Sequence, residues 1–461
     1  MSRRPDPQAR RPPSVDRVVS AVPSEAVSAR DRAAVVAAAR EVIEAERRRL
    51  GSSLEAEARA IADLASDVAS RLEEREEGWD AGAVDVINAT GVLIHTNLGR
   101  ATWPAAAIEA ARRAAAGPML LELDPSTGRR GRRYRAAEEA LVELTGSQDA
   151  LVTNNNAAAV ALTVGLAGRG GGVVVSRGEL VEIGGGVRIP EIVRRAGARL
   201  VEVGTTNRTR AADFEEAFAA GRTKVVLRVH RSNFRQDGFV EDADLGAVAN
   251  LAHEHGAIVV DDLGSGALLA TERYGLPHEP MPGERLAAGA DLVTFSGDKL
   301  VGGPQAGLVV GRADLITRIR QDPLARAMRP DKVTLAAVAA TLGLYRGGRA
   351  AREIPLWRAV AAPLGGLQAR ASALAARVDG TAMPTDATFG GGALPGVLVP
   401  SSGVALAARN AEALLAALRS EDPAVIGRIE HGRVVLDLRT VEPARDEDLA
   451  AAVLRARTRI G

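Results

Sequence analysis

Short runs of β-branched and other apolar residues alternate with helix-length stretches from about residue 83 to residue 341. The apolar runs lie at 173–176, 200–203, 225–229, 257–262, 292–296 and 307–311. Continuous apolar strands separated by helices are typical of a parallel sheet that helices cover on both faces. The pattern therefore predicts an α/β domain with a mainly parallel sheet over 83–341.

The two ends of the chain show different patterns. Residues 1–25 are rich in proline and arginine without periodicity, and we expect a flexible arm there. Residues 26–82 carry apolar positions at helical spacing, which predicts a small helical module with Ser52 or Ser53 capping its second helix. Residues 342–461 mix alanine-rich helices with strand-like runs and predict a smaller α+β domain.

Composition narrows the possible functions. The 461 residues are 46% hydrophobic, enough for a large core, and the formal net charge of +1 gives no overall attraction to nucleic acid. The absence of cysteine excludes disulfides, thiolate nucleophiles and cysteine-bound metals, and the six histidines show no metal-ligand spacing, so we expect no metal site. No apolar run reaches the roughly 20 residues that span a bilayer. We therefore expect a cytoplasmic protein without a membrane segment.

Lysine is rare, and one lysine stands out. Only Lys224, Lys299 and Lys332 occur, against 56 arginines. Lys299 follows the apolar run 292–296 and precedes the segment GGPQAG, at the strand edge where open α/β sheets bind ligands. A partly desolvated amine at that edge can form a Schiff base with an aldehyde, and pyridoxal phosphate (PLP) is the obvious one. An ordinary surface lysine in a turn is the alternative for this segment.

A PLP site needs a carboxylate for the ring nitrogen and donors for the phosphate. Asp261 and Asp262 end a predicted strand, and only one of them can face the ring, because successive strand residues point to opposite faces. Asn155 and Asn156 precede an alanine-rich helix, and Ser296 lies three residues before Lys299. A helix cap without a ligand is the alternative for the asparagines.

Several long polar motifs together resemble the bacterial selenocysteine synthases, the L-seryl-tRNA(Sec) selenium transferases. The motifs are INATGVLIHTNLGRA, TNNNAAAV, VVSRGELVEIGGG, EVGTTNRT, RVHRSNFRQDGF, VDDLGSG, FSGDKLVGGPQAG and RAMRPDK. The resemblance covers most of residues 26–440. It implies a PLP-dependent enzyme of fold type I in which 83–341 is the catalytic domain, Lys299 carries PLP and Asp262 is the ring partner.

The resemblance also implies substrate and partners. Serine on tRNA(Sec) would lose its hydroxyl to give a dehydroalanyl intermediate, and selenium from selenophosphate would then add. The N-terminal module would bind the tRNA, and the chain would form a homodecamer with sites at dimer interfaces. The implied active-site residue beside the lysine is Asp298, the implied cofactor contacts are Asn155, Asn156, Ser232 and Ser296, and the implied selenophosphate contacts are Arg100, Thr205, Thr206, Arg326 and Arg329.

Two other functions remain open at this point. A PLP-dependent lyase acting on a free amino acid or an amino sugar acid would need the same lysine and aspartate. A catalytically inactive tRNA-binding or scaffold protein would not need the cofactor. The arginine-rich run 128–135 could hold phosphates of tRNA or of the donor, or meet an acidic neighbouring subunit, or be a solvated loop.

Overall fold

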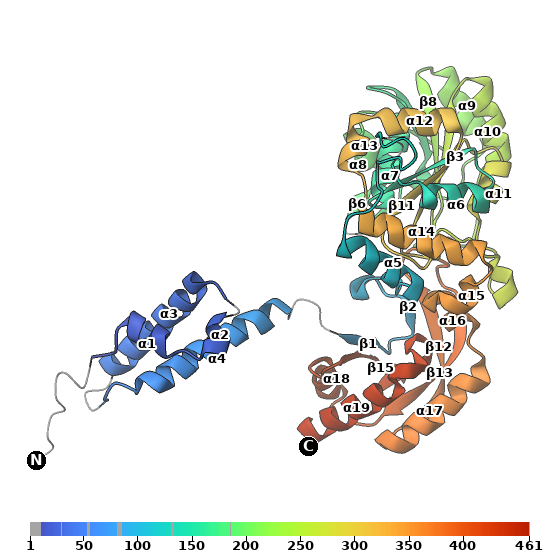
Figure 1. The fold of residues 1–461 in the computed structure, drawn as a ribbon. Helices are drawn as coiled ribbons and strands as arrows, with labels where there is room; N and C mark the ends of the chain where they lie inside the picture. Colours follow the sequence, from blue (N-terminus) through green and yellow to red (C-terminus); the bar gives the residue numbers. More distant parts are fainter. Residues whose placement is uncertain are drawn as a thin grey trace, which may run out of the picture. The chain divides into compact units, whose positions relative to one another are not determined.

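The computed structural model describes residues 11–28, 30–52, 56–80, 85–130, 133–184 and 186–460 (Figure 1). Contacts within the chain divide it into two compact units, Met1–Asp85 and Val86–Gly461. No helix in the described ranges has both the length and the apolar character needed to cross a bilayer.

The N-terminal unit is helical. Its helices are α1 (Val15–Ala21), α2 (Ser24–Ser28), α3 (Arg32–Ser52) and α4 (Ile61–Asp80). Val18 of α1 is fully buried in one cluster with Val35 and Val42 of α3 and Leu64 of α4. A helix face needs apolar residues three or four positions apart, and the buried residues Val35, Ala38 and Val42 supply such a face on α3.

Two expectations for this unit are wrong. The arm predicted over 1–25 contains α1, because Val15, Val18, Val19 and Val22 follow helical spacing and pack on the core; residues 1–10 lie outside the described ranges. Ser52 is the last residue of α3 and does not cap α4, and Ser53 lies outside the described ranges.

A seven-stranded sheet forms the centre of the second unit, in the order β3-β11-β10-β9-β8-β4-β7. Its strands are β3 (Asp149–Thr153), β4 (Gly172–Ser176), β7 (Arg199–Val203), β8 (Thr223–Val229), β9 (Ile258–Gly264), β10 (Leu292–Ser296) and β11 (Gly307–Gly311). All neighbours pair in parallel except β10 with β11 and β11 with β3. The mainly parallel α/β sheet is confirmed; β3 was not predicted.

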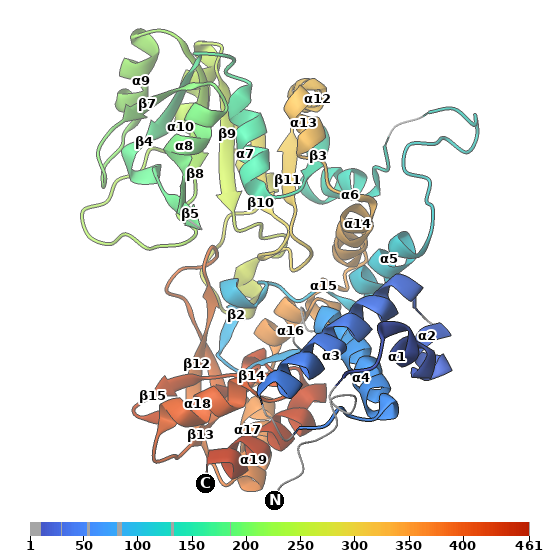
Figure 2. The same cartoon turned by 90° about the vertical axis from the view of Figure 1, so that its left-hand side faces the viewer.

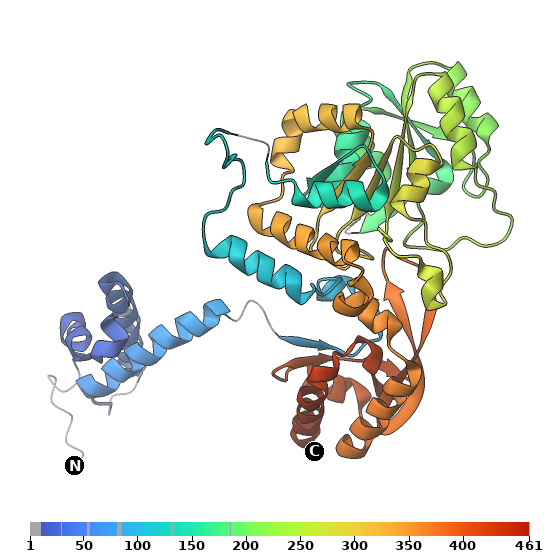
Figure 3. The same cartoon turned by 45° about the vertical axis from the view of Figure 1, so that its right-hand side comes forward.

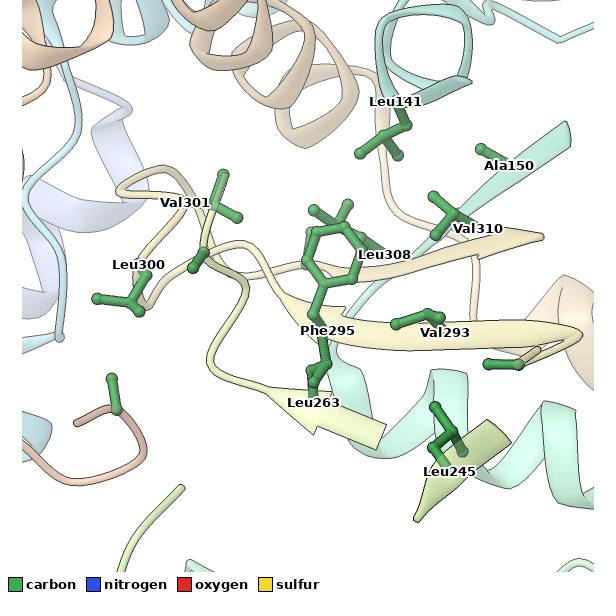
Figure 4. Packing of buried hydrophobic residues seen from close by; sticks show 14 of the residues in the cluster. Leu141, Ala150, Leu245, Leu263, Val293, Phe295, Leu300, Val301, Leu308 and Val310 are labelled. Carbon is green, nitrogen blue, oxygen red and sulfur yellow. The ribbon is translucent and has the colours of Figure 1, made fainter. Parts of the chain in front are cut away.

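Helices cover both faces of this sheet (Figure 2). One cluster contains Val173 and Val175 of β4 and residues of α7 (Asn156–Gly165), α8 (Ile189–Arg195) and α12 (Ala313–Gln321). The opposite cluster contains Val174 and residues of α6 (Ala136–Thr145), α9 (Ala211–Ala219), α10 (Leu245–Glu254) and α14 (Lys332–Arg346). Figure 4 shows Phe295 of β10 in that second cluster, close to Leu263 and Leu308. Alternation of side chains along each strand produces the two cores.

A second, five-stranded sheet has the order β15-β16-β13-β12-β2. Its strands are β2 (Val92–Ile94), β12 (Thr381–Gly390), β13 (Leu398–Leu406), β15 (Arg428–Glu430) and β16 (Arg433–Asp437). A cluster of apolar side chains joins it to α17 (Leu364–Val378), α18 (Ala411–Arg419) and α19 (Asp446–Ile460) (Figure 3). Residues 86–94, which precede the large sheet in the chain, therefore pair with C-terminal strands, since β1 (Val86–Asn88) also pairs with β14 (Ala424–Ile426).

The remaining elements connect these parts. They are α5 (Ala105–Ala116), α11 (Pro282–Ala287), α13 (Pro323–Ala327), α15 (Ala350–Glu353), α16 (Pro355–Ala361) and the short hairpin of β5 (Glu182–Gly184) and β6 (Val187–Arg188). Helix α14 packs on α5 and α6 and continues past residue 341, so no break in structure occurs where the sequence pattern changes.

Candidate active site

Lys299 lies in the turn that follows β10, with its amine enclosed by backbone from two parts of the unit. A Cβ atom built on Gly264, at the end of β9, would lie 3.5 Å from Lys299 Nζ, and one built on Gly392, after β12, would lie 2.6 Å from it. The other lysines differ: Lys224 is exposed on β8, and Lys332 donates to the carbonyl of Gly117. Lys299 is therefore not the solvated surface lysine of the alternative interpretation.

The surroundings of the amine change its acidity. Burial lowers the pKa of Lys299 below its usual 10.5, because a charged amine loses its hydration there. The carboxylates of Asp262, Asp298 and Glu279 oppose that shift, and the guanidinium of Arg100 reinforces it. A lowered pKa supplies more of the neutral, nucleophilic amine at neutral pH.

The two aspartates at the end of β9 point to different partners. Asp262 is 3% exposed and accepts hydrogen bonds from Asn156 Nδ2 at 2.8 Å and Thr294 Oγ1 at 3.1 Å. Asp261 is 1% exposed and forms an ion pair with Arg285 of α11. Burial raises the pKa of Asp262, while its hydrogen bond from Asn156 and the nearby Lys299 charge oppose the rise. Asp262 is thus the aspartate on the side of the lysine.

Arg100 and Asp298 form an ion pair next to the lysine. Arg100 Nη1 lies 2.9 Å from Asp298 Oδ2, and the Ala101 amide donates to the Asp298 carbonyl oxygen at 3.2 Å. Asp298 is 4% exposed, and its Oδ1 atom is buried without a hydrogen-bond partner in the described structure. A buried carboxylate oxygen without a donor marks a place where a bound group can supply one.

The residues expected to hold a phosphate lie around the start of α7. Asn155 caps that helix, since its side chain accepts from the Ala158 amide at 2.9 Å. Asn156 Oδ1 is buried and has no hydrogen-bond partner in the described structure. Ser296 is buried at the end of β10, and Ser232 Oγ lies 3.3 Å from the Cβ position of Gly264. Asn155 is therefore a helix cap at the end of α7 where a phosphate would bind, whereas Asn156 faces Asp262.

Four of the residues predicted to contact selenophosphate have no hydrogen bond or ion pair with Lys299 and its neighbours in the described part of the chain. Thr205 and Thr206 are exposed, and Thr205 Oγ1 donates to the Arg208 carbonyl oxygen. Arg326 is exposed on α13, and Arg329 lies 3.7 Å from Glu122. Within the described ranges, no hydrogen bond or ion pair links these four residues to Lys299, Asp298 or Asp262.

Three of the five arginines in the run 128–135 form ion pairs within the chain. Arg130 and Arg133 pair with Glu122, and Arg135 pairs with Glu138 and Asp149. Residues 131 and 132 lie outside the described ranges. Arg133 and Arg135 are thus held against the protein, whereas the Arg130 side chain is 77% exposed and stays solvated.

Sequence reasoning missed three neighbours of the site. Thr294 pairs in register with Asp262, and its position two residues before Ser296 places both on the same strand face, a signal that was available. Glu279 Oε1 lies 3.2 Å from His230 Nε2, and nothing near Glu279 in the sequence indicated it. Gly392 belongs to a run of three glycines whose role only the fold reveals.

Comparisons with known proteins show which proteins this chain is similar to. The family model described as L-seryl-tRNA selenium transferase matches residues 86–442. The L-seryl-tRNA(Sec) selenium transferase of Rhizobium meliloti is 43% identical over 443 residues, covering 93% of each chain. That of Carboxydothermus hydrogenoformans is 46% identical over 365 residues, covering 77% of this chain and 78% of its own.

A solved structure supports the fold. D-glucosaminate-6-phosphate ammonia-lyase aligns with a TM-score of 0.60 at 22% identity, covering 83% of this chain and 98% of that chain. At this identity the likeness concerns the fold alone.

Proposed function

The chain belongs to the L-seryl-tRNA selenium transferase family and is an enzyme of the PLP-dependent fold type I, and on this premise we propose its reaction and its site. The enzyme converts the seryl group of L-seryl-tRNA(Sec) to a selenocysteinyl group, with PLP attached to Lys299. The observation that carries the proposal is the enclosed Lys299 amine beside Asp262 and the Arg100–Asp298 pair.

The residues of the site fit the cofactor. The amine of Lys299 would hold its aldehyde carbon, and Asp262 would pair with the ring nitrogen. The first backbone amides of α7, which Asn155 caps, together with the hydroxyls of Ser232 and Ser296, would receive its phosphate, and Asn156 would hold Asp262 in place through its Nδ2 hydrogen bond. The unpartnered Oδ1 atoms of Asn156 and Asp298 are each an acceptor left for a hydrogen-bond donor of a bound group. When bound, PLP withdraws electrons from the substrate α-carbon and so acidifies its proton.

The protein residues then move protons and hold charge. Lys299, whose pKa burial lowers, takes the α-proton of the serine ester. The β-hydroxyl leaves with a proton as water, which gives the dehydroalanyl group on tRNA. Selenium of selenophosphate adds to the β-carbon, a proton adds to the α-carbon, and water cleaves the selenium–phosphorus bond to release phosphate.

The donor contacts follow the same proposal. Arg100 is a fixed cation next to Lys299 and suits an oxyanion. Thr205, Thr206, Arg326 and Arg329 would bind selenophosphate in a site shared between subunits of a homodecamer. Their exposure in the single chain is consistent with contacts to another subunit. Among the described residues, the ion pair of Arg329 is a long one, with 3.7 Å between its Nη1 atom and Glu122 Oε1.

The N-terminal unit would bind tRNA(Sec), in a cytoplasmic enzyme. A gel shift with tRNA(Sec) tests this part, using the full chain and a chain that starts at residue 81. Loss of binding in the shorter chain supports the assignment, and equal binding contradicts it.

The decisive experiment supplies seryl-tRNA(Sec) and selenophosphate and identifies the amino acid on the tRNA afterwards. We expect selenocysteine with the native enzyme and serine with Lys299→Ala. Borohydride reduction followed by peptide mapping should place the pyridoxyl group on Lys299. Turnover of a free amino acid or amino sugar acid, with unchanged seryl-tRNA, would instead favour a lyase.

A further inference from the structure

Three consecutive glycines, Gly390 to Gly392, form a turn that touches the Lys299 side chain. A Cβ atom built on Gly392 would lie 2.6 Å from Lys299 Nζ, 2.7 Å from Cε and 3.2 Å from Cδ. Real Cβ atoms do not approach other atoms at 2.6 Å, so a side chain at position 392 would force the end of the lysine side chain, from Cδ to Nζ, to shift. The backbone of Gly392 is therefore one wall of the space that holds the amine.

The second sheet holds this turn in place. Strand β12, orange in Figure 3, runs from the C-terminal sheet toward the large sheet and ends at Gly390. Thr388 and Gly390 pair with Val92 and Ile94 of β2. A Cβ atom on Gly390 would lie 2.7 Å from the Ile94 carbonyl oxygen, so the two strands meet at close range.

The other end of the turn is anchored in the core. Ala393 and Leu394 are 0% and 4% exposed and belong to the apolar cluster of the large sheet. A turn fixed by strand pairing before it and by buried side chains after it has little freedom to retreat from the lysine.

The pairing of β2 with β12 also positions Arg100 near the lysine. After β2 the chain passes through the short 3-10 helix η1 (Thr96–Leu98) to Arg100, whose guanidinium pairs with Asp298 beside Lys299. The C-terminal sheet thus brings both the Gly392 wall and Arg100 to a lysine that the large sheet presents. Gly264 of the large sheet lies on another side of the same amine.

We propose that Gly392 is a positioning residue for Lys299, an inference that rests on the proposed function for its link to PLP. The bare backbone at 392 confines the amine while leaving the lysine room to attach to the cofactor and to move away when substrate replaces it. A methyl group at 392 would force Lys299 out of this position and hinder attachment of PLP.

The test compares Gly392→Ala with a matched control in the same loop, Gly396→Ala. Both glycines have positive φ, +92° and +74°, so both substitutions strain the backbone. A Cβ atom on Gly396 meets nothing within 4 Å, so only G392A adds the collision with the lysine. Both variants are prepared as full-length chains, and their folding is checked by circular dichroism.

The first measurement is PLP binding to each apoprotein, followed by the visible absorbance of the bound cofactor and by borohydride trapping at Lys299. We expect an apparent dissociation constant for PLP about tenfold higher or more in G392A than in G396A. Equal PLP binding and trapping in the two variants would overturn the proposal. If the native protein itself does not take PLP on Lys299, the proposed function fails, and the next measurement still tests the contact.

The second measurement is a double-mutant cycle on the apoproteins by urea denaturation. Removing the lysine side chain in K299A removes the collision, so G392A should shift the midpoint by at most about half as much in K299A as in the native background. The strain of positive φ is present in both backgrounds and cancels. An equal shift in both backgrounds overturns the proposal.

The same cycle covers the case in which G392A does not fold. The double variant K299A/G392A should then fold, because the colliding side chain is gone. Failure of the double variant, with K299A and G396A both folded, also overturns the proposal.

Discussion

Asp262→Asn and Asp261→Asn form a matched pair that tests which carboxylate serves the cofactor. The two aspartates are adjacent in β9 and are both almost fully buried, at 3% and 1% exposure. Asp262 lies on the lysine side with Asn156 and Thr294, whereas Asp261 pairs with Arg285. The substitutions remove one charge each at nearly constant volume.

The expected stabilities of the two apoproteins differ. D261N leaves the Arg285 guanidinium without its buried partner, which should cost about 2–3 kcal/mol, below the usual cost of breaking a fully buried pair because Arg285 is partly exposed. D262N keeps an oxygen that accepts from Asn156 and Thr294, so its free energy of unfolding should change by about 1 kcal/mol or less.

The sign of the pH dependence supports this estimate. Burial raises the pKa of Asp262 above its usual 3.8. The folded state therefore loses stability as the pH rises from about 3.8 through the raised pKa of the folded state. Replacement by asparagine removes this loss at neutral pH, which offsets the amide's poorer hydrogen bonding.

The two variants should rank the other way in activity, with the larger loss in D262N. With PLP bound, D262N removes the charge that pairs with the ring nitrogen and should lower the rate of selenium transfer about 10²-fold or more, whereas D261N should retain most activity. Urea denaturation of the apoproteins and single-turnover assays at equal PLP occupancy give both quantities. A larger activity loss in D261N than in D262N would refute the assignment of Asp262.

Three further predictions concern other ionisable groups. Arg100→Met and Asp298→Asn should be non-additive by about 1–3 kcal/mol in a double-mutant cycle of urea denaturation, because their 2.9 Å ion pair is largely buried. Burial lowers the pKa of Lys299, so the apoprotein should gain stability as pH rises from the folded pKa toward 10.5, and Lys299→Met should remove this gain in melting temperature. The Arg49 hydrogen bond lowers the pKa of Glu46 to about 2, so the N-terminal unit should lose stability as pH falls from 4.5 toward 2. Hydrogen exchange in α3 should show that loss in the native chain and not in Glu46→Gln.

Each of these three has a clear contrary result. Additive effects of R100M and D298N would mean that the pair contributes nothing, and identical pH profiles for native and K299M apoproteins would mean that the amine is freely hydrated. Equal acid sensitivity of the native chain and E46Q would mean that protonation of another group, and not of Glu46, causes the loss of stability.

Local pattern predicted much of the fold. The six apolar runs of the large sheet are strands: the five inner ones are buried between helices, whereas the edge strand β7 buries only Val203 of its five residues. Strand β3 is as long as β4, β7, β10 and β11, and it was missed because it runs directly into the polar motif that starts α7. Helix α1 was missed because the proline- and arginine-rich residues around it hide four valines at helical spacing.

Some residues of the site could also be predicted from the sequence, and others could not. Lysine scarcity, the polar motif after β10 and the pair of aspartates led to Lys299 and Asp262 from the sequence. The pairing of Asp261 with Arg285 and the contact of Glu279 with His230 join residues 24 and 49 positions apart. No local pattern encodes such contacts, because they depend on which elements pack together.

The amino-acid sequence by itself determined six of the seven strands of the large sheet, the chemistry available at their ends and the family, since these follow from side-chain type, spacing and motif. Only the tertiary structure decided that β2 and β12 from opposite ends of the second unit pair, and that this pairing sets Gly392 and Arg100 against the site of Lys299. Strand pairing over such a separation depends on the hydrogen bonds and apolar burial of the whole fold, and therefore leaves no trace in any one segment of the sequence.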